Sequence, residues 1–195
     1  MAYFNYNRRK SSVAQIGDTP MGGENPIRIQ SMANVSTMDT EAAVAQAIRM
    51  IEAGAEYVRF TAQGEREARN LGEIRKQLNE QGYTTPLVAD IHFNPGNYVD
   101  KVKTFSHLEY TDEEYAAEIE RIRERFVPFL NICKAHGTAI RIGVNHGSLS
   151  DRIMSRYGDT PEGMVASCME FLRICREENF PDVVISIKAS NTVVM

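Results

Sequence analysis

The chain has 195 residues, 43% hydrophobic and 25% charged, a composition that suits one globular domain and leaves little room for two. A formal net charge of −4 excludes a general nucleic-acid binder, because neutralising phosphates requires a surplus of Lys and Arg on one face. No apolar run approaches the roughly 20 residues that cross a bilayer. The basic amino-terminal stretch also lacks the apolar core of a signal peptide, so we expect a cytoplasmic protein.

The first part of the chain alternates strands with helices. A cap at Asp39 or Thr40 and a stop at Gly54 delimit the first expected helix. A charged outer helix follows further on, ending near Gly82. The expected elements are, in chain order, a strand at 27–32 (IRIQSM), the first helix, a strand at 57–62 (YVRFTA), the outer helix at 65–80 and a strand at 86–91 (PLVADI).

The alternation breaks after the third strand. Residues 92–110 are polar and rich in turn formers, and they show no 3.6-residue period. A patternless stretch of this length is unusual inside a compact domain. The interval between the strands that start near 86 and 138 has room for about two strand–helix units but shows one helix. We therefore expect a helix and a strand to be missing here.

The second part begins with a long helix that has Thr111 or Asp112 as its cap and an expected kink at Pro128. The apolar face of this helix comprises Tyr115, Ile119, Ile122, Phe126, Leu130 and Cys133. Two further strands, at 138–145 (TAIRIGVN) and 182–189 (DVVISIKA), flank a helix that Thr160 and Pro161 open.

Five strands that alternate with amphipathic helices indicate an α/β fold with a parallel sheet, either a barrel or an open sheet. The spacing of the strand starts favours barrel units, and a barrel of eight units needs about 250 residues. The sequence therefore predicts a partial TIM (β/α)8 barrel, and residues 1–195 form a single incomplete domain.

The three cysteines, Cys133, Cys168 and Cys175, form no C-x-x-C pair and no zinc-binding spacing. We expect reduced thiols rather than a disulfide scaffold. Cys168 and Cys175 lie seven residues apart on an apolar helical stripe, which indicates core packing.

Polar side chains interrupt or close the apolar strands, where parallel α/β folds bind their ligands. The candidates are Arg59, Asp90, His92, Arg141, Asn145 and Lys188. One interpretation is a satisfied polar layer in which Arg59 and Arg141 pair with Asp90. Three cations against one obvious carboxylate instead favour an anionic ligand such as a phosphate or diphosphate.

Asp90 and His92 are separated by one residue and therefore face the same side of their strand. The pair could form half of a metal site, but no third ligand is evident, and an Asp that orients a His for hydrogen bonding or proton transfer is commoner. The turn from Asn94 to Asn97 offers amides suited to phosphate oxygens, although such turns are often ordinary ones.

Several of these stretches together resemble one family. They are PMGGENPIRIQSM, GAEYVRFT, PLVADIHF, IRIGVNHGSLSDRIMSRYGDTPEGM and SIKAS, in this order, and the likeness runs from about Ser11 to the last residue. The family is hydroxymethylbutenyl diphosphate synthase, the reductive iron–sulfur enzyme of the methylerythritol phosphate route to isoprenoids. The acidic segment that precedes the fourth strand is similar to the form of the enzyme with an extra central domain.

The resemblance implies an amino-terminal TIM barrel that holds methylerythritol cyclodiphosphate by its diphosphate. It also implies a carboxy-terminal domain with a [4Fe–4S] cluster, bound by three Cys and a Glu. Two electrons from ferredoxin or flavodoxin would open the ring and expel the hydroxyl group, giving hydroxymethylbutenyl diphosphate. A homodimer is compatible with this family.

The resemblance assigns roles to the candidates. Arg59, Arg141 and Lys188 would contact the diphosphate, with Asn145 and Asn97 beside them. Asp90 and His92 would line the same pocket as catalytic residues, by hydrogen bonding to the substrate and by assisting proton transfer.

The sequence departs from the family in two ways. We expect residues 1–195 to lack the later barrel strands, the central domain and the iron–sulfur domain, and none of the three cysteines matches a cluster ligand. In addition, two Asn-Pro turns that stand one helix and one strand apart in the family are fused at Asn94–Asn97. This apparent internal deletion removes the Arg expected before the second turn, so we expect the diphosphate site to lack one cation.

Two other readings of the residues stay open. One is a pterin- or phosphate-binding barrel of the dihydropteroate synthase type, which has similar polar strand ends. The other is a non-catalytic assembly fragment, because an incomplete barrel leaves strand edges open for pairing.

Overall fold

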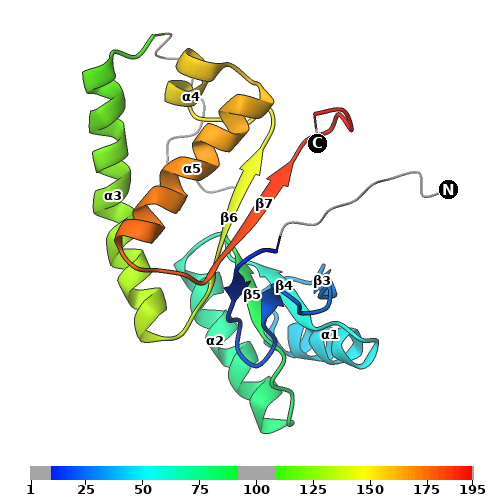
Figure 1. The fold of residues 1–195 in the computed structure, drawn as a ribbon. Helices are drawn as coiled ribbons and strands as arrows, with labels where there is room; N and C mark the ends of the chain where they lie inside the picture. Colours follow the sequence, from blue (N-terminus) through cyan, green and yellow to red (C-terminus); the bar gives the residue numbers. More distant parts are fainter. Residues whose placement is uncertain (1–9, 92–108, 195) are drawn as a thin grey trace, which may run out of the picture.

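The computed structural model describes residues 10–91 and 109–194 (Figure 1). Two of the predicted site residues, His92 and Asn97, lie outside these ranges, as does the turn at 94–97. Within the described ranges, none of the helices combines the length and the apolar character that a membrane crossing requires.

The five strands and four helices that the sequence predicts are all present, with boundaries shifted by a few residues. Two features were not predicted: a short antiparallel hairpin formed by β1 and β2, and helix α4. Both are too short to show a hydrophobic period. The elements are β1 Val13–Ala14, β2 Met21–Gly22, β3 Gln30–Met32, α1 Thr40–Glu52, β4 Tyr57–Thr61, α2 Glu65–Glu80, β5 Leu87–Asp90, α3 Asp112–Ala135, β6 Ile140–Asn145, α4 Asp151–Tyr157, α5 Pro161–Glu177 and β7 Val183–Lys188.

Three of the helices begin at the predicted caps. The side chain of Asp39 accepts a hydrogen bond from the backbone N–H of Ala42, 3.1 Å away, at the start of α1. Thr111 and Glu114 form a reciprocal capping box at the start of α3. Thr160 caps α5, whose first residue is a proline. Each cap satisfies backbone N–H groups that the first helical turn leaves without partners.

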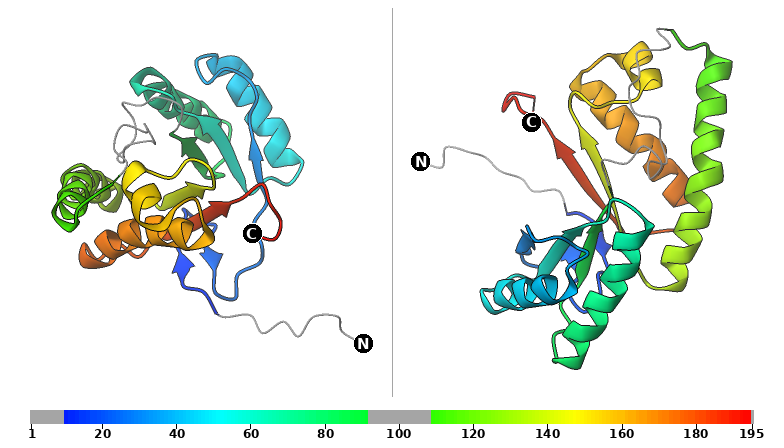
Figure 2. Two further views of the ribbon diagram at one scale, coloured as in Figure 1. Left: turned by 90° about the horizontal axis from the view of Figure 1, so that it is seen from above. Right: turned by 180° about the vertical axis from the view of Figure 1, so that it is seen from behind.

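The strands form two parallel sheets in place of one closed ring. The first sheet has the order β3-β4-β5, and the second pairs β6 with β7. The helices lie outside the strands, as the view from above shows (Figure 2). The prediction of a partial barrel is therefore confirmed, and among the described residues the ring is interrupted between β5 and β6.

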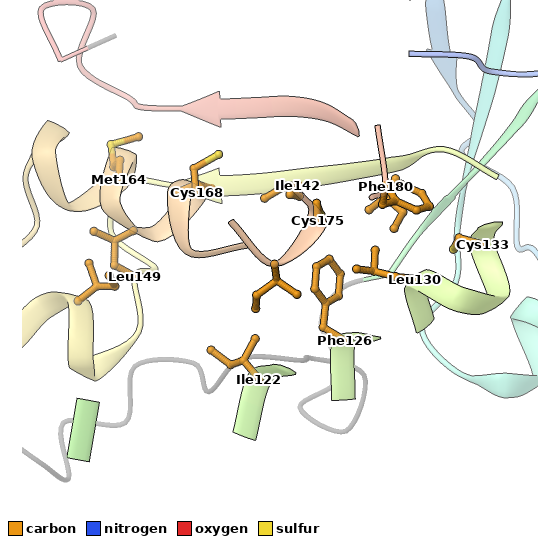
Figure 3. Close-up of a cluster of buried hydrophobic side chains, with 14 residues drawn as sticks. Ile122, Phe126, Leu130, Cys133, Ile142, Leu149, Met164, Cys168, Cys175 and Phe180 are labelled. Carbon is orange, nitrogen blue, oxygen red and sulfur yellow. The ribbon is translucent and has the colours of Figure 1, made fainter. Parts of the chain in front are cut away.

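Each sheet has its own apolar core on the helix side. The larger core lies between β6, α3 and α5 (Figure 3). Four residues of the predicted face of α3 are buried there, namely Ile122, Phe126, Leu130 and Cys133. Cys168 and Cys175 lie in the same core, which confirms that they are packing residues. The smaller core joins the first sheet to α1 and α2.

Strand β6 shows how this packing orients the polar residues. Its buried residues are Ile140, Ile142 and Val144, and its exposed residues are Arg141, Gly143 and Asn145. Successive side chains of a strand point to opposite faces, so burial of the first set against the helices turns the second set toward the inside of the partial barrel.

Candidate anion-binding site

An ion pair between two neighbouring strands forms the first part of the site. Arg59, on β4, donates from Nη2 to Oδ2 of Asp90, the last residue of β5. The register of the two strands aligns Thr61 with Asp90, so the arginine starts two residues earlier and reaches forward along the barrel interior. The side chains are 28% and 13% exposed, respectively. The predicted pairing of Asp90 with a strand arginine is thus confirmed for Arg59.

Arg141 has a different environment. Its Nη2 donates to Oγ of Ser186 at 3.0 Å, and its Nη1 donates to Oε1 of Gln30 at 3.3 Å. Both partners are neutral, so they orient the guanidinium without cancelling its charge. The bond to Gln30 also joins β6 to β3, since each residue lies on one of these strands. The two residues are 111 positions apart in the sequence.

The charges of Arg59 and Asp90 act on Arg141. Loss of water around the guanidinium lowers the pKa of Arg141, the nearby positive charge of Arg59 lowers it further, and Asp90 raises it. An arginine with an ordinary pKa above 12 stays charged at neutral pH despite such a shift. The structure therefore brings Arg59, Asp90 and Arg141 into one interior cluster.

Asn145 and Lys188 lie side by side at the carboxyl ends of β6 and β7. Their backbones are fixed by the turn that follows, in which His146 N donates to the carbonyl of Lys188 at 2.9 Å. Ser148 donates to the carbonyl of Asn145 from both its backbone N and its Oγ, each at 3.2 Å. This pair stands four residues beyond Arg141 along the strands, so it lies at the rim and not in the cluster itself.

The charge balance of the site is positive. Two cations, Arg59 and Arg141, share the interior cluster with Asp90, whose charge is engaged by Arg59, and a third cation, Lys188, lies at the rim. Arg141 and Lys188 make no ion pair with any other residue in the described part of the chain. Lys188 lies at the carboxyl end of β7, whereas Arg141 lies near the amino end of β6. Ammonium and guanidinium groups left in excess in this way are suited to binding phosphate oxygens.

Sequence reasoning did not identify Gln30 and Ser186. A signal for both exists, because each is a polar residue at an interior-facing position of an apolar strand, in IRIQSM and ISIKA. Alternation places such residues on the inner face but does not reveal which side chain they contact across the barrel.

The cysteines do not fit an iron–sulfur cluster. All three are free and buried among apolar side chains, and burial raises the pKa of each thiol. Cluster ligands must be thiolates that share one exposed or cavity-facing location. No group of three or more His, Cys, Asp and Glu side chains within residues 10–91 and 109–194 could hold a metal ion.

The fold and the site define a class of protein: a partial parallel α/β barrel whose inner face and rim carry more cations than carboxylates. Residues 11–195 match the family model described as the GcpE TIM-barrel domain. The chain belongs to this family. The membership agrees with the resemblance found in the sequence and gives no support to a pterin-binding barrel.

Relatives of the chain share one name, 4-hydroxy-3-methylbut-2-en-1-yl diphosphate synthase (flavodoxin). The protein of Parabacteroides distasonis is 92% identical over the whole chain, which covers 35% of that protein. The proteins of Phocaeicola vulgatus and Protochlamydia amoebophila are 68% and 50% identical, with 34% and 31% of their lengths covered. The chain thus spans about a third of the length of these relatives.

The match to one of these relatives is longer than the chain itself. The match to the Parabacteroides distasonis protein extends over 212 positions, which is 17 more than the 195 residues of this chain. Since 92% of 212 is about 195, nearly every residue of the chain is identical to its counterpart. The difference between the two sequences therefore consists mainly of 17 positions that this chain lacks.

Proposed function

We propose that this chain is the diphosphate-binding barrel part of a hydroxymethylbutenyl diphosphate synthase. The whole enzyme would convert 2-C-methyl-D-erythritol 2,4-cyclodiphosphate to 4-hydroxy-3-methylbut-2-enyl diphosphate in isoprenoid biosynthesis. Membership of the family and the shared name of the relatives support this proposal. The observation that carries it is Arg141, a cation oriented by two neutral partners beside an arginine that is already paired.

The proposed roles follow from these environments. Arg141 binds the diphosphate, because its planar guanidinium can donate two hydrogen bonds to phosphate oxygens. Lys188 and Asn145 contact the substrate from the rim. Asp90 holds Arg59 in position. After the family resemblance, Asp90 and His92 are the proposed catalytic residues, which hydrogen-bond the substrate and assist proton transfer.

The remaining chemistry belongs to the whole protein. A [4Fe–4S] cluster would supply the two electrons for ring opening, and the described residues of this chain do not hold it. The proposed electron donor is flavodoxin, after the name of the relatives, with ferredoxin as the alternative. Residues 1–195 are then one incomplete amino-terminal barrel domain, and the proposed location is the cytoplasm.

Calorimetric titration of the purified chain with the cyclodiphosphate tests the proposal. Arg141→Ala removes the oriented cation and should weaken binding about tenfold to a hundredfold, the loss expected for a charge-assisted hydrogen bond. Arg141→Lys keeps the charge but not the planar pair of donors, so it should restore only part of the affinity.

Lys76→Ala is the matched control, because Lys76 is an exposed cation on the outer helix α2. Its affinity for the cyclodiphosphate should equal that of the unaltered chain. Equal binding by Arg141→Ala and Lys76→Ala would contradict the assignment of the site.

A further inference from the structure

The turn that follows β6 starts at Asn145, one of the proposed substrate-binding residues. The carbonyl of Asn145 accepts hydrogen bonds from both the backbone N–H and the hydroxyl group of Ser148, each at 3.2 Å. Within the turn, Gly147 has a φ of +84°, whereas the φ of His146 is not positive. A left-handed third residue between such a hydrogen-bonded pair is typical of a type II turn.

The turn does not itself hold the peptide group between His146 and Gly147. A turn of this kind uses the N–H of its fourth residue, so the N–H of the third residue needs an acceptor elsewhere. Asp159 supplies that acceptor, because its Oδ1 accepts a hydrogen bond from the N–H of Gly147 at 3.0 Å. The same aspartate also meets the imidazole of His146, whose Nε2 lies 3.2 Å from its backbone oxygen and 3.7 Å from Oδ1. Asp159 therefore contacts both middle residues of the turn.

The linker that carries Asp159 is fixed at both ends. Its first residue, Gly158, donates its N–H to the carbonyl of Met154 at 3.0 Å, at the end of α4. Its last residue, Thr160, caps α5. A side chain at Gly163, in the first turn of α5, would lie only 2.6 Å from the carbonyl oxygen of Gly158, so the linker and the helix pack closely. Asp159 can thus act as a firm support for the turn.

The supported turn joins the two residues of the rim. His146 N donates to the carbonyl of Lys188, which pairs with Asn145 in the register of β6 and β7. The side chain of Asn145 is exposed and forms no hydrogen bond with the rest of the described chain. The position of this side chain therefore depends on the backbone at the start of the turn.

We propose that Asp159 is a positioning residue for the anion-binding site. By holding the N–H of Gly147, it keeps the turn in the arrangement that presents Asn145 beside Lys188 to the ligand. Turns of types I and II differ mainly in the orientation of their central peptide group, so loss of this acceptor frees that group to rotate. The inference rests on the proposed function, in which Asn145 and Lys188 contact the substrate.

Calorimetric titration of the full chain with the cyclodiphosphate tests this role. Asp159→Ala removes the acceptor and should weaken binding about threefold to tenfold, the range expected for one hydrogen bond. Asp159→Asn keeps a carbonyl oxygen that can accept from Gly147, so it should bind like the unaltered chain. A loss in Asp159→Asn as large as that in Asp159→Ala would overturn the proposal, because the charge and not the acceptor would then matter.

Asp182→Ala is the matched control. Asp182 also accepts a hydrogen bond from a backbone N–H, that of Gln15 at 2.7 Å, but it precedes β7 and lies at the opposite end of that strand from Lys188. Its substitution should leave the affinity unchanged. Equal binding by Asp159→Ala and Asp182→Ala would contradict the positioning role.

A double-mutant cycle shows whether Asp159 acts through Asn145. Once Asn145→Ala has removed the side chain that is positioned, adding Asp159→Ala should cause little further loss of affinity. Losses that add fully in the double variant would overturn the proposal, because Asp159 would then act on the ligand by another route.

Hydrogen exchange of the free chain tests the support without a ligand. The amide of Gly147 should exchange at least tenfold faster in Asp159→Ala than in the unaltered chain, and Asp159→Asn should restore slow exchange. An unchanged rate in Asp159→Ala would overturn the proposal. If the unaltered chain does not bind the cyclodiphosphate, the proposed function fails, and the exchange of Gly147 still decides whether Asp159 holds the turn.

Discussion

Arg59 and Arg141 are both arginines on the inner face of a parallel strand, yet they differ in what their guanidinium groups contact. Arg59 meets a carboxylate, whereas Arg141 meets an amide and a hydroxyl group. Side-chain chemistry alone predicted an excess of positive charge, and the structure attributes that excess to Arg141 and Lys188. The partners of Arg141 could not be predicted, because β3 and β7 meet it from distant parts of the sequence.

The buried thiol of Cys175 makes stability dependent on pH. Burial raises the pKa of Cys175 from 9.0 to about 11, so the folded state favours the neutral thiol. The stabilisation is complete below pH 9 and is lost as the pH rises toward 11, by up to about 2–3 kcal/mol. Urea unfolding at pH 8 and at pH 10.5 should show that the stability difference between the chain and Cys175→Ala shrinks at the higher pH. A constant difference would contradict this account.

At the scale of the elements, a buried polar cluster joins three helices of the second sheet. Arg152, on α4, donates to Oε2 of Glu170, on α5, at 2.5 Å. Tyr115, on α3, donates its hydroxyl group to the other carboxylate oxygen. The side chains of Arg152 and Glu170 are only 1% and 5% exposed. Burial, followed by the contact with Glu170, raises the pKa of Tyr115.

This cluster predicts a large effect of a small substitution. Glu170→Gln removes the buried negative charge that Arg152 and Tyr115 contact, which should lower the free energy of unfolding by about 3–5 kcal/mol. Glu177→Gln is the matched control, because Glu177 pairs with Arg123 at the surface and should lose less than about 1 kcal/mol. Urea unfolding of both variants measures the difference, and equal losses would show that the cluster adds no stability.

Helix α4 also shows what local patterns cannot predict. Its seven residues follow the Gly-containing turn after β6, and its Arg152 is fully buried, against the usual preference of arginine for the surface. Glu170, a charged partner that offsets the cost of this burial, comes from another helix. The long helices α2, α3 and α5 were predictable, by contrast, because an apolar face marks each of them within its own sequence. Capping residues also mark the starts of α3 and α5.

At the scale of the whole molecule, the order of elements followed from the strand and helix patterns. The interruption of the ring between β5 and β6 agrees with the place where the expected alternation fails in the sequence. What the sequence could not predict is that the two parts keep their own cores. Strands β3–β5 pack on α1 and α2, and strands β6 and β7 pack on α3 and α5, so each part buries its apolar face without a closed barrel.

The interruption also bears on function, because the family resemblance places an additional arginine in the absent strand. A chain in which the helix and strand expected from the resemblance are restored at Asn94–Asn97 should therefore bind the cyclodiphosphate more tightly than the present chain. One charge-assisted contact corresponds to about tenfold to a hundredfold in affinity.

Calorimetric titration of these two chains with the cyclodiphosphate is the most direct test of the account. We expect measurable binding by the restored chain and an affinity about tenfold to a hundredfold lower for the present one. Absence of binding by the restored chain would contradict the proposed function, and equal affinities would contradict the assignment of a missing cation to the interrupted ring.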